Sequence, residues 1–352
     1  MRLDKIQNRA GLDHPIVRNS SFELLRIIAM LGIVASYFAY GNFSFPKDSI
    51  MLNGLWIQLI IMGGKLGVHI FVLISGYFLI ESGRIKIRKL AGMWAAMLFY
   101  SVMFCFAFVM SGAVSFSGKE ALYAFMPLTK SRWWFLTVYF MLYLLHPYIN
   151  TMLKNLSKSE YEKMLLIMTF CWSVVPTFTN SFLASDDLIW FIYLYSISGY
   201  IRLWADDFGS RKYIWLSVML IALNFLIVII FDVIGLKVRM FAEHPLHLYN
   251  TQMLPTLLIP VCILMGFKHL NMKYSRFINV TASATIGVYM IHTDKFFSRY
   301  MWDEIFRINS FQNSPYLIPY SIAVILVIYV SCTLIELTRS KIFRALSCGR
   351  LS

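Results

Sequence analysis

FELLRIIAMLGIVASYFAYG, residues 22–41, is the stretch of sequence that decides the fold, because it is an apolar run of membrane-spanning length with one arginine near its head. About 20 apolar residues in a helix cross the hydrocarbon core of a bilayer. An arginine at the centre of such a helix costs roughly 2.5–3.5 kcal/mol on insertion scales, and intramembrane ionisable groups usually face a pocket or a pathway. Arg26 is therefore a candidate functional residue.

Tyr37 follows Arg26 in the same run, eleven residues later. At about 1.5 Å and 100° per residue, a helix rises about 16 Å over that distance and returns to within about 20° of the starting face. Arg26 and Tyr37 therefore share one stripe of the predicted helix. Glu23, nearly one turn before Arg26, is placed to orient or to neutralise the guanidinium. Ser36 is adjacent to Tyr37 but diverges from it by about 100°.

The composition of the 352-residue chain is that of a polytopic membrane protein. Hydrophobic residues make up 59% and charged residues only 14%, whereas about 25% charged residues is usual in soluble proteins. We predict an all-α integral membrane protein with about ten transmembrane helices. Hydrophobic runs of near-spanning length recur at 22–41, 66–81, 90–112, 133–153, 164–178, 188–201, 213–234, 249–267, 278–293 and 316–338.

Two features leave the number of spans open. The runs 164–178 and 188–201 are short for a span, so eight helices with re-entrant pieces is a second interpretation. The segment 51–64, MLNGLWIQLIIMGG, ends just before Lys65. It is an interfacial or re-entrant helix, or the front of one long tilted second span.

Lysine and arginine residues predict the orientation in the membrane. With the N-terminus inside, the expected inner segments carry more than twice as many of these residues as the outer ones, and the positive-inside rule then assigns both termini to the cytoplasm. The chain divides into a cytoplasmic segment 1–21, a transmembrane domain 22–338 and a cytoplasmic tail 339–352. The net charge of +14 is thus mainly a topology signal. No nucleic-acid partner is expected, since no soluble domain offers a clustered basic surface.

The sequence gives no sign of processing or of a metal site. The first 21 residues are too polar for a signal peptide, so the first helix is expected to be retained. The five cysteines lie in apolar runs or in the tail, without a C-x-x-C pair. They therefore indicate neither disulfides nor a zinc site.

Several motifs stand out along most of the chain: ELLRIIAM followed by VAS, GVHIFVLISGYFL at 67–79, WWF at 133–135 with HPY at 146–148, and VYMIH at 288–292. Together they resemble the membrane acyltransferase-3 family of integral-membrane O-acyltransferases. The hallmark of that family's first helix is Arg, ten residues, then His. Arg26 matches the arginine, and Tyr37 stands at the position of the histidine.

The resemblance implies acyl transfer in the cytoplasmic membrane of a bacterium. Acyl-CoA, with acetyl-CoA expected, gives its acyl group to a hydroxyl of an envelope or extracellular polysaccharide or its lipid-linked precursor. In the family pattern the first-helix histidine is the general base, and the arginine, here Arg26, holds donor or anion. A basic Arg-x-Arg element after the second helix is associated with the donor and is matched here by Lys86 and Arg88. The alternative is that these cations set topology and bind lipid headgroups.

Tyr37 does not meet the requirement for a general base. A phenol with a pKa near 10 is ionised in only about one molecule in a thousand at pH 7, and losing a positioned base typically costs about 10²–10⁴-fold in rate. Ser36 has no activating histidine or lysine within a helical turn. We therefore expect weak or absent catalysis by the family's route, unless His69, His146 or His292 is folded into the site.

Other candidates each have a structural and a functional interpretation. Ser75 and Gly76 allow close helix packing or the approach of an acyl chain. Trp134 and its aromatic neighbours anchor the membrane interface or stack on sugars. His69 is a hydrogen-bonded interior residue or a ligand, and His292 caps a helix end or takes part in catalysis.

Three functions remain open at this point. The first is a working O-acyltransferase that uses another base, with acyl-CoA as donor substrate and no resident cofactor. The second is an inactive family member that binds donor or glycan as a partner protein. A lipid-linked glycan flippase or polymerase shares the hydropathy but does not predict this motif set. Membrane lipid is a partner in every case.

Overall fold

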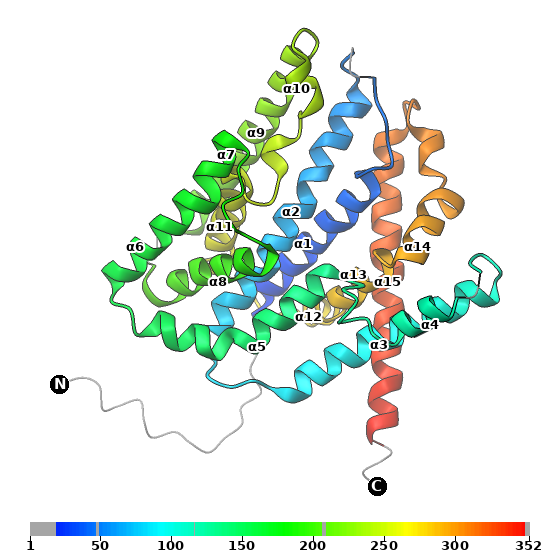
Figure 1. Ribbon diagram of the computed structural model, residues 1–352, viewed down its shortest axis with the longest axis horizontal. Coiled ribbons are helices and arrows are strands. Elements are labelled where there is room, and N and C mark those ends of the chain that lie inside the picture. Colours follow the sequence, from blue (N-terminus) through cyan, green and yellow to red (C-terminus); the bar gives the residue numbers. More distant parts are fainter. Residues whose placement is uncertain (1–18, 47–48, 116, 206–208, 349–352) are drawn as a thin grey trace.

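The computed structural model describes residues 19–46, 49–115, 117–205 and 209–348 (Figure 1). It is 78% helix, and the described residues contain no strand. The expected cytoplasmic segments 1–21 and 339–352 fall partly on residues 1–18 and 349–352, which lie outside the described residues. We call the end of the molecule at which α1 begins and α15 ends the lower end, as in Figure 1, and the opposite end the upper end.

The long helices are α1 (Ser20–Ala39), α2 (Leu52–Leu79), α3 (Ile87–Met110), α5 (Trp134–Lys154), α8 (Asp187–Trp204), α9 (Ser210–Gly235), α11 (Leu254–Lys268) and α15 (Leu317–Cys348). Shorter helices connect them: α4 (Gly118–Ala124), α6 (Lys158–Thr169), α7 (Val175–Thr179), α10 (Arg239–Glu243), α12 (Arg276–Ser283), α13 (Thr285–His292) and α14 (Lys295–Tyr300). The remaining turns are π-helical in η1 (Phe170–Val174) and η3 (Met301–Ile305), and 3-10 in η2 (His247–Tyr249) and η4 (Ile308–Phe311).

The predicted all-α, multi-pass architecture is confirmed. Within the described residues, six segments are long and apolar enough to cross a membrane: Ser20–Ala39, Leu52–Leu79, Ile87–Met110, Arg211–Gly235, Arg239–Lys268 and Leu317–Ala345. The fifth is not one continuous helix, because α10 and η2 precede α11. The other expected spans, at 133–153, 164–178, 188–201 and 278–293, are helical over most of their length but fall outside these six. The number ten stays a prediction.

The segment 51–64 is the front of one long second helix. α2 continues without a break from Leu52 to Leu79, over 28 residues. At 1.5 Å per residue it is about 42 Å long, which exceeds the roughly 30 Å of the hydrocarbon core. The interfacial and re-entrant interpretations of this segment are therefore wrong.

Three other expected spans are interrupted, two of them close to a proline. The run 164–178 passes through the π-turn η1 just before Pro176, whose ring removes a backbone donor. The run 278–293 is divided at Ala284 into α12 and α13. The run 249–267 becomes a regular helix only at Leu254, with Pro255 in its first turn, where proline is tolerated.

α1 and α2 form the central pair of the fold, and glycines set their separation. A Cβ on Gly32 of α1 would lie 2.9 Å from the carbonyl oxygen of Gly63 on α2. A Cβ on Gly67 would lie 2.4 Å from the carbonyl oxygen of Ala29. Small residues four apart let helix backbones approach this closely. Neither position has room for a larger side chain unless the helices move apart.

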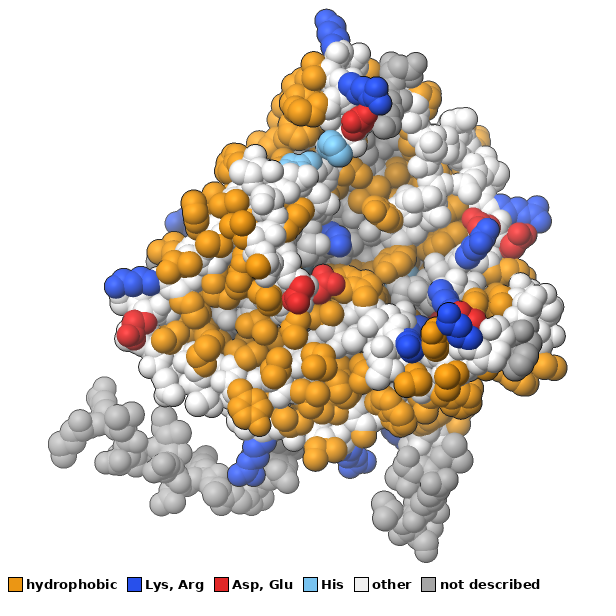
Figure 2. Space-filling model, in the orientation of Figure 1, with side chains coloured by type: hydrophobic (Ala, Val, Ile, Leu, Met, Phe, Trp, Pro, Cys, Tyr) orange, Lys and Arg blue, Asp and Glu red, His pale blue; other side chains and the backbone are white. Residues whose placement is uncertain are grey.

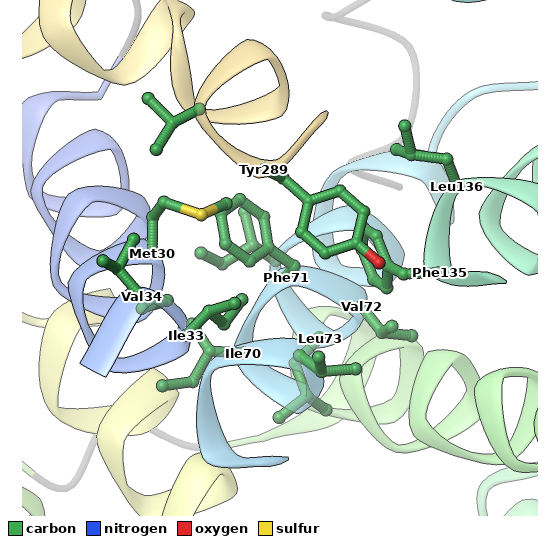
Figure 3. Packing of buried hydrophobic residues seen from close by; sticks show 14 of the residues in the cluster. Met30, Ile33, Val34, Ile70, Phe71, Val72, Leu73, Phe135, Leu136 and Tyr289 are labelled. Carbon is green, nitrogen blue, oxygen red and sulfur yellow. The ribbon is translucent and has the colours of Figure 1, made fainter. Parts of the chain in front are cut away.

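The core lies around this pair. Figure 3 shows side chains from α1, α2 and α5 meeting Tyr289 of α13. In the most apolar stretch of α2, 61% of the residues are buried. In the corresponding stretch of α9, only 17% are buried. α9 therefore presents most of its hydrophobic surface outward, and Figure 2 shows hydrophobic side chains over much of the visible face. Outward apolar surface of this extent is what a lipid environment requires.

Candidate functional site

A cavity of about 670 Å³ opens on the face seen in Figure 2, over the end of α1 and the middle of α2. Small-molecule sites have volumes of about 300–1,000 Å³, so the size is appropriate for a ligand. The walls come from α1, α2, the first residue of α5, the segment 246–250 and the segment 289–303. We call this the central cavity. Its lining is rich in aromatic and polar side chains, among them Tyr37, Lys65, Trp134, Tyr249, Tyr289 and Trp302.

The inner wall of the cavity is formed where α1 and α2 pack closely together. A Cβ on Gly64 would lie 2.3 Å from Ser36 Oγ, so the backbone of α2 lies directly against the Ser36 side chain there. Ser36 and Tyr37 line the cavity from α1, and Lys65 lines it from α2. The short approach brings a tyrosine and a lysine into the same cavity from residues 28 apart in the sequence.

Tyr37 lies between the cavity and a buried histidine. Its hydroxyl faces the side chains of Trp134 and Tyr289. The ring centroids of Tyr37 and His292 are 5.3 Å apart with the rings perpendicular, and those of Tyr289 and His292 are 6.2 Å apart. His292 is fully buried and does not line the cavity, whereas both tyrosines do. The imidazole therefore lies behind the two phenol rings.

The hydrogen bonding of His292 leaves one nitrogen available. Nδ1 lies 2.6 Å from the carbonyl oxygen of Val288, which can only accept, so Nδ1 carries the proton. Nε2 is buried and has no hydrogen-bond partner among the described residues. His292 thus bonds a carbonyl at the end of α13, as the helix-cap interpretation expects. It also holds an unused lone pair beside Tyr37.

Lys65 was not singled out by the sequence patterns beyond its charge, although a lone lysine inside an apolar run is the same signal that Arg26 gives. Its ammonium nitrogen lies 5.8 Å from the centroid of the Trp134 ring. It forms no ion pair or hydrogen bond with the described residues, and Asp187 acts on it only at longer range. Lys65 is therefore a cation in the central cavity without a paired carboxylate among those residues.

His69 has both ring nitrogens engaged in the interior. Nδ1 lies 2.7 Å from the carbonyl oxygen of Thr256, and Trp190 Nε1 donates to Nε2 at 3.0 Å. The ring is fully buried and does not line the cavity. Its geometry is that of a hydrogen-bonded interior residue joining α2, α8 and α11.

His146 compensates a proline inside α5. Pro147 has no amide proton, so the carbonyl of Tyr143 loses its usual helical donor. His146 Nδ1 lies 2.6 Å from that carbonyl oxygen and supplies the missing hydrogen bond. Its Nε2 is buried without a hydrogen-bond partner among the described residues. His146 is not among the residues that line the central cavity.

Ser75 and Gly76 lie in a tight contact between helices. Ser75 Oγ donates to the carbonyl oxygen of Phe71 at 2.8 Å and lies 3.4 Å from the Tyr139 hydroxyl. A Cβ on Gly76 would lie 2.1 Å from Ser198 Oγ. α8, rather than open space, therefore lies against Gly76, which favours the helix-packing interpretation.

The structure does not bring Arg26 and Tyr37 together. Arg26 Nη1 donates to Glu23 Oε1 at 2.8 Å, and Glu23 is buried near the start of α1. Arg26 does not line the central cavity. The shared stripe is present, but about 16 Å of helix rise separates the two side chains.

The basic segment lies at the same end as Arg26. Lys86 and Arg88 are exposed at the start of α3, and Lys86 occupies its N-cap position. Lys89 Nζ lies 4.7 Å from the centroid of the Tyr143 ring. The segment therefore packs on α5 while its two candidate cations face outward.

A buried ion pair that the sequence patterns did not reveal joins two walls of the cavity. Arg132, just before α5, donates from Nε to Asp294 Oδ2 at 2.8 Å, and its Nη2 lies 2.6 Å from the same oxygen. Asp294 also caps α14 by accepting from the amides of Phe296 and Phe297. Burial raises the pKa of the Asp294 carboxyl, while the Arg132 charge acts in the opposite direction. The pair therefore joins the loop before α5 to the residue that caps α14.

A family model for an acyltransferase domain, acyltransferase-3, matches residues 19–336. The matched span runs from the start of α1 into α15 and includes every residue that lines the central cavity. It also includes the basic segment before α3. No curated protein and no solved structure matches the chain.

Proposed function

Because the chain belongs to the acyltransferase-3 family, we propose that it is a membrane O-acyltransferase. The acyl group, an acetyl group in the simplest case, moves from acyl-CoA to a hydroxyl of an envelope or extracellular polysaccharide or its lipid-linked precursor. The acceptor oxygen forms an ester as the thioester bond breaks, and the acceptor proton passes to a base and then to the CoA thiolate. The protein acts in the bacterial cytoplasmic membrane with both termini in the cytoplasm.

We propose that the acceptor binds in the central cavity, and the lining of this cavity is the main support for the proposed function. It combines aromatic side chains with polar groups in one concave, ligand-sized space. Sugars present apolar C–H faces and hydroxyls together, so a lining of this mixed character suits them. Tyr37, at the inner wall, is the residue that an acceptor hydroxyl would meet.

The basic segment at the lower end supports a donor site there. Lys86 and Arg88 stand at the start of α3, where backbone amides lack helical partners and favour anions. Lysine binds phosphate as a point charge and arginine as a fork. The phosphates of acyl-CoA would lie at this end, on the same side as Arg26, and its pantetheine arm would carry the thioester toward Tyr37.

His292 is the base that the structure favours for this reaction. Tyr37 stands where the family has its histidine, and a phenol is a poor base at neutral pH. Among His69, His146 and His292, only His292 contacts Tyr37, and its Nε2 holds a free lone pair. In our proposal the acceptor proton reaches Nε2 by way of the Tyr37 hydroxyl, which requires the Tyr37 side chain to turn toward the imidazole.

A second candidate function follows from the same residue. Tyr37 and Tyr289 separate the cavity from His292. If the phenol does not pass the proton on, the protein binds donor or glycan without turnover, as an inactive family member. The two candidates share the cavity and the donor segment and differ only in turnover.

The experiment is ester analysis of the envelope glycan in cells with and without the gene. The proposal expects an O-acyl ester that disappears on deletion and returns with the parent gene. His292→Gln should lower that ester by about 10²-fold or more at matched protein level, as expected for loss of a general base. His146→Gln is the matched control, because it removes another buried imidazole with the same Nδ1 contact to a carbonyl.

Each outcome identifies one function. An ester that is unchanged by deletion contradicts the acyltransferase and favours the inactive, binding form. Loss or shortening of the glycan itself, with its ester content per sugar unchanged, indicates a flippase or polymerase. Equal losses in His292→Gln and His146→Gln contradict the assignment of His292 as the base.

A further inference from the structure

We infer that the acceptor bound in the central cavity is an anionic saccharide, whose carboxylate or phosphate is held by Lys65. This inference rests on the proposed function in one respect, since it treats the central cavity as the acceptor site. It adds the chemical class of the substrate and the residue that selects it.

The position of Lys65 is costly without a ligand. It lies in the middle of α2, a 28-residue apolar helix. Of the most apolar stretch of α2, 61% of the residues are buried inside the protein. A charged side chain in such a helix is expensive and usually faces a pathway or binding site. Lys65 faces the central cavity.

The charge of Lys65 has no direct ion-pair partner among the described residues, in contrast to the charges of Lys295 and Arg299, which also line the cavity. Lys295 pairs with Glu120, and Arg299 Nε lies 3.7 Å from Asp303 Oδ2. The Lys65 ammonium lies over the face of Trp134, and Asp187 acts on it only at longer range, without forming an ion pair. The lining holds three basic residues, Lys65, Lys295 and Arg299, and one acidic residue, Asp303, which is already paired with Arg299.

The surroundings of the ammonium fit an anion carried on a sugar. Trp134 and Tyr289 give apolar surface beside the cation, while Ser36 and Asn250 give hydroxyl and amide groups. A charge-assisted hydrogen bond in a concave site is stronger than one in water. A neutral sugar would leave the ammonium without a partner, so the cavity should discriminate against it.

The test measures binding by the full-length protein in detergent, without acyl transfer. Equilibrium dialysis with radiolabelled methyl β-D-glucuronide, glucose 1-phosphate and methyl β-D-glucoside at equal ionic strength gives three affinities. The two anionic probes distinguish carboxylate from phosphate. We expect at least one of them to bind about tenfold or more tighter than the neutral glycoside, the size of one hydrogen bond to a charged group.

Variants locate the preference. Lys65→Gln should remove it, whereas Lys65→Arg should keep most of it. Lys119→Gln is the matched control, since Lys119 also stands near an aromatic ring, at 5.7 Å from the Tyr123 centroid, but outside the cavity. A second measurement needs no variant: an amine-reactive acylating reagent is applied to the parent protein, and mass spectrometry reads whether the tighter anionic probe protects Lys65.

Equal affinity of the parent for charged and neutral probes overturns the inference. So does a preference that Lys65→Gln retains, or labelling of Lys65 that the anionic probe leaves unchanged. If Lys65→Gln abolishes ester formation in cells and leaves the anion preference intact, Lys65 serves the reaction itself rather than the acceptor. Failure of the proposed function is seen separately, as an envelope ester that does not depend on the gene.

Discussion

Tyr37 is the side chain through which the central cavity meets His292. Its ring lies against the imidazole on one side and its residue lines the cavity on the other. A hydroxyl bound in the cavity therefore meets a weak base first and a better base only behind it. The chemistry available to the protein depends on this single residue more than on any other in the cavity.

Tyr37→His should create or greatly raise acyl transfer. The change replaces a phenol that is almost never ionised at neutral pH by an imidazole whose unperturbed pKa near 6.5 suits a general base. A positioned base is worth about 10²–10⁴-fold in rate. The measurement is acetyl incorporation into the envelope glycan in cells that express each variant at matched level.

The controls for this substitution separate the bases. Arg26→Ala should abolish the gain, because Arg26 is the donor- or anion-holding residue of the proposed reaction. Tyr37→Phe should lower activity, because the Tyr37 hydroxyl relays the proton in the proposed reaction, and unchanged activity would contradict that relay. A parent that acylates as fast as Tyr37→His would show that Tyr37 does not limit the reaction.

At the scale of elements, the α1–α2 contact sets the geometry of the cavity. Three glycines of α2 meet the backbone or a small side chain of α1 along one line. Because side chains cannot fill the space between the two helices, their backbones fix where Tyr37 and Lys65 stand relative to each other. A change in this contact should therefore alter the cavity without touching its lining.

Gly67→Ala should destabilise the protein and weaken ligand binding together. The new methyl would lie 2.4 Å from the Ala29 carbonyl oxygen and 2.7 Å from Ile33 Cγ1. Overpacking of this kind typically costs about 1–3 kcal/mol. The midpoint of thermal unfolding in detergent should fall. Gly92→Ala is the control, because nothing lies within 4 Å of its Cβ position and alanine favours a helix by about 1 kcal/mol; an equal fall in both variants would contradict the argument.

The basic residues at the start of α3 are predicted to bind the CoA phosphates. Lys86→Ala with Arg88→Ala should weaken CoA binding by more than about tenfold without unfolding the protein, since each 1.4 kcal/mol is tenfold and two phosphate contacts are removed. The assay is CoA titration of the purified protein in detergent. Arg211→Ala with Lys212→Ala removes another exposed basic pair at a helix start and should change nothing. If Lys86→Ala with Arg88→Ala leaves the affinity for CoA unchanged, these two residues do not bind the donor and serve only to orient the protein in the membrane.

At the scale of the whole molecule, one ion pair joins two expected outer segments, and another joins an expected inner segment to the end of an expected span. Arg132 and Asp294 link the loops 113–132 and 294–315. At the other end, Arg202, which follows the expected span 188–201, pairs with Glu81, the last residue of the expected span 66–81, at 2.9 Å. The loops 113–132 and 294–315, which the charge bias assigns to the outer side, therefore meet at one end of the molecule.

Cysteine labelling should place the loops 113–132 and 294–315 outside and both termini inside. In a variant without native cysteines, Lys119→Cys should react with a membrane-impermeant maleimide in intact cells. Lys86→Cys should react only after permeabilisation. Both positions are exposed, so accessibility of the side chain does not bias the result. The opposite pattern would reverse the topology and move the proposed donor site to the outer face.

Much of the fold was open to prediction from the sequence because hydropathy is a property of each segment alone. The first helix, expected at 22–41, runs from Ser20 to Ala39, and the run expected at 90–112 lies in α3. The breaks were harder to predict, because a helix interruption such as that at Ala284 is decided by the residues packed around it. The segment 51–64 shows the same limit, because its hydropathy and length left open whether it continues into the helix that follows, and the structure shows one helix from Leu52 to Leu79.

The sequence by itself determined the membrane class, the helical fold, the family resemblance and the stripe shared by Arg26 and Tyr37, because these follow from composition, local motifs and helical periodicity. Only the tertiary structure decided which residues meet. It set His292 behind Tyr37, left Lys65 unpaired among the described residues, and gave His146 the carbonyl freed by Pro147. The physical reason is that the period of a helix defines its face, but the partner of that face depends on how distant helices rotate and pack.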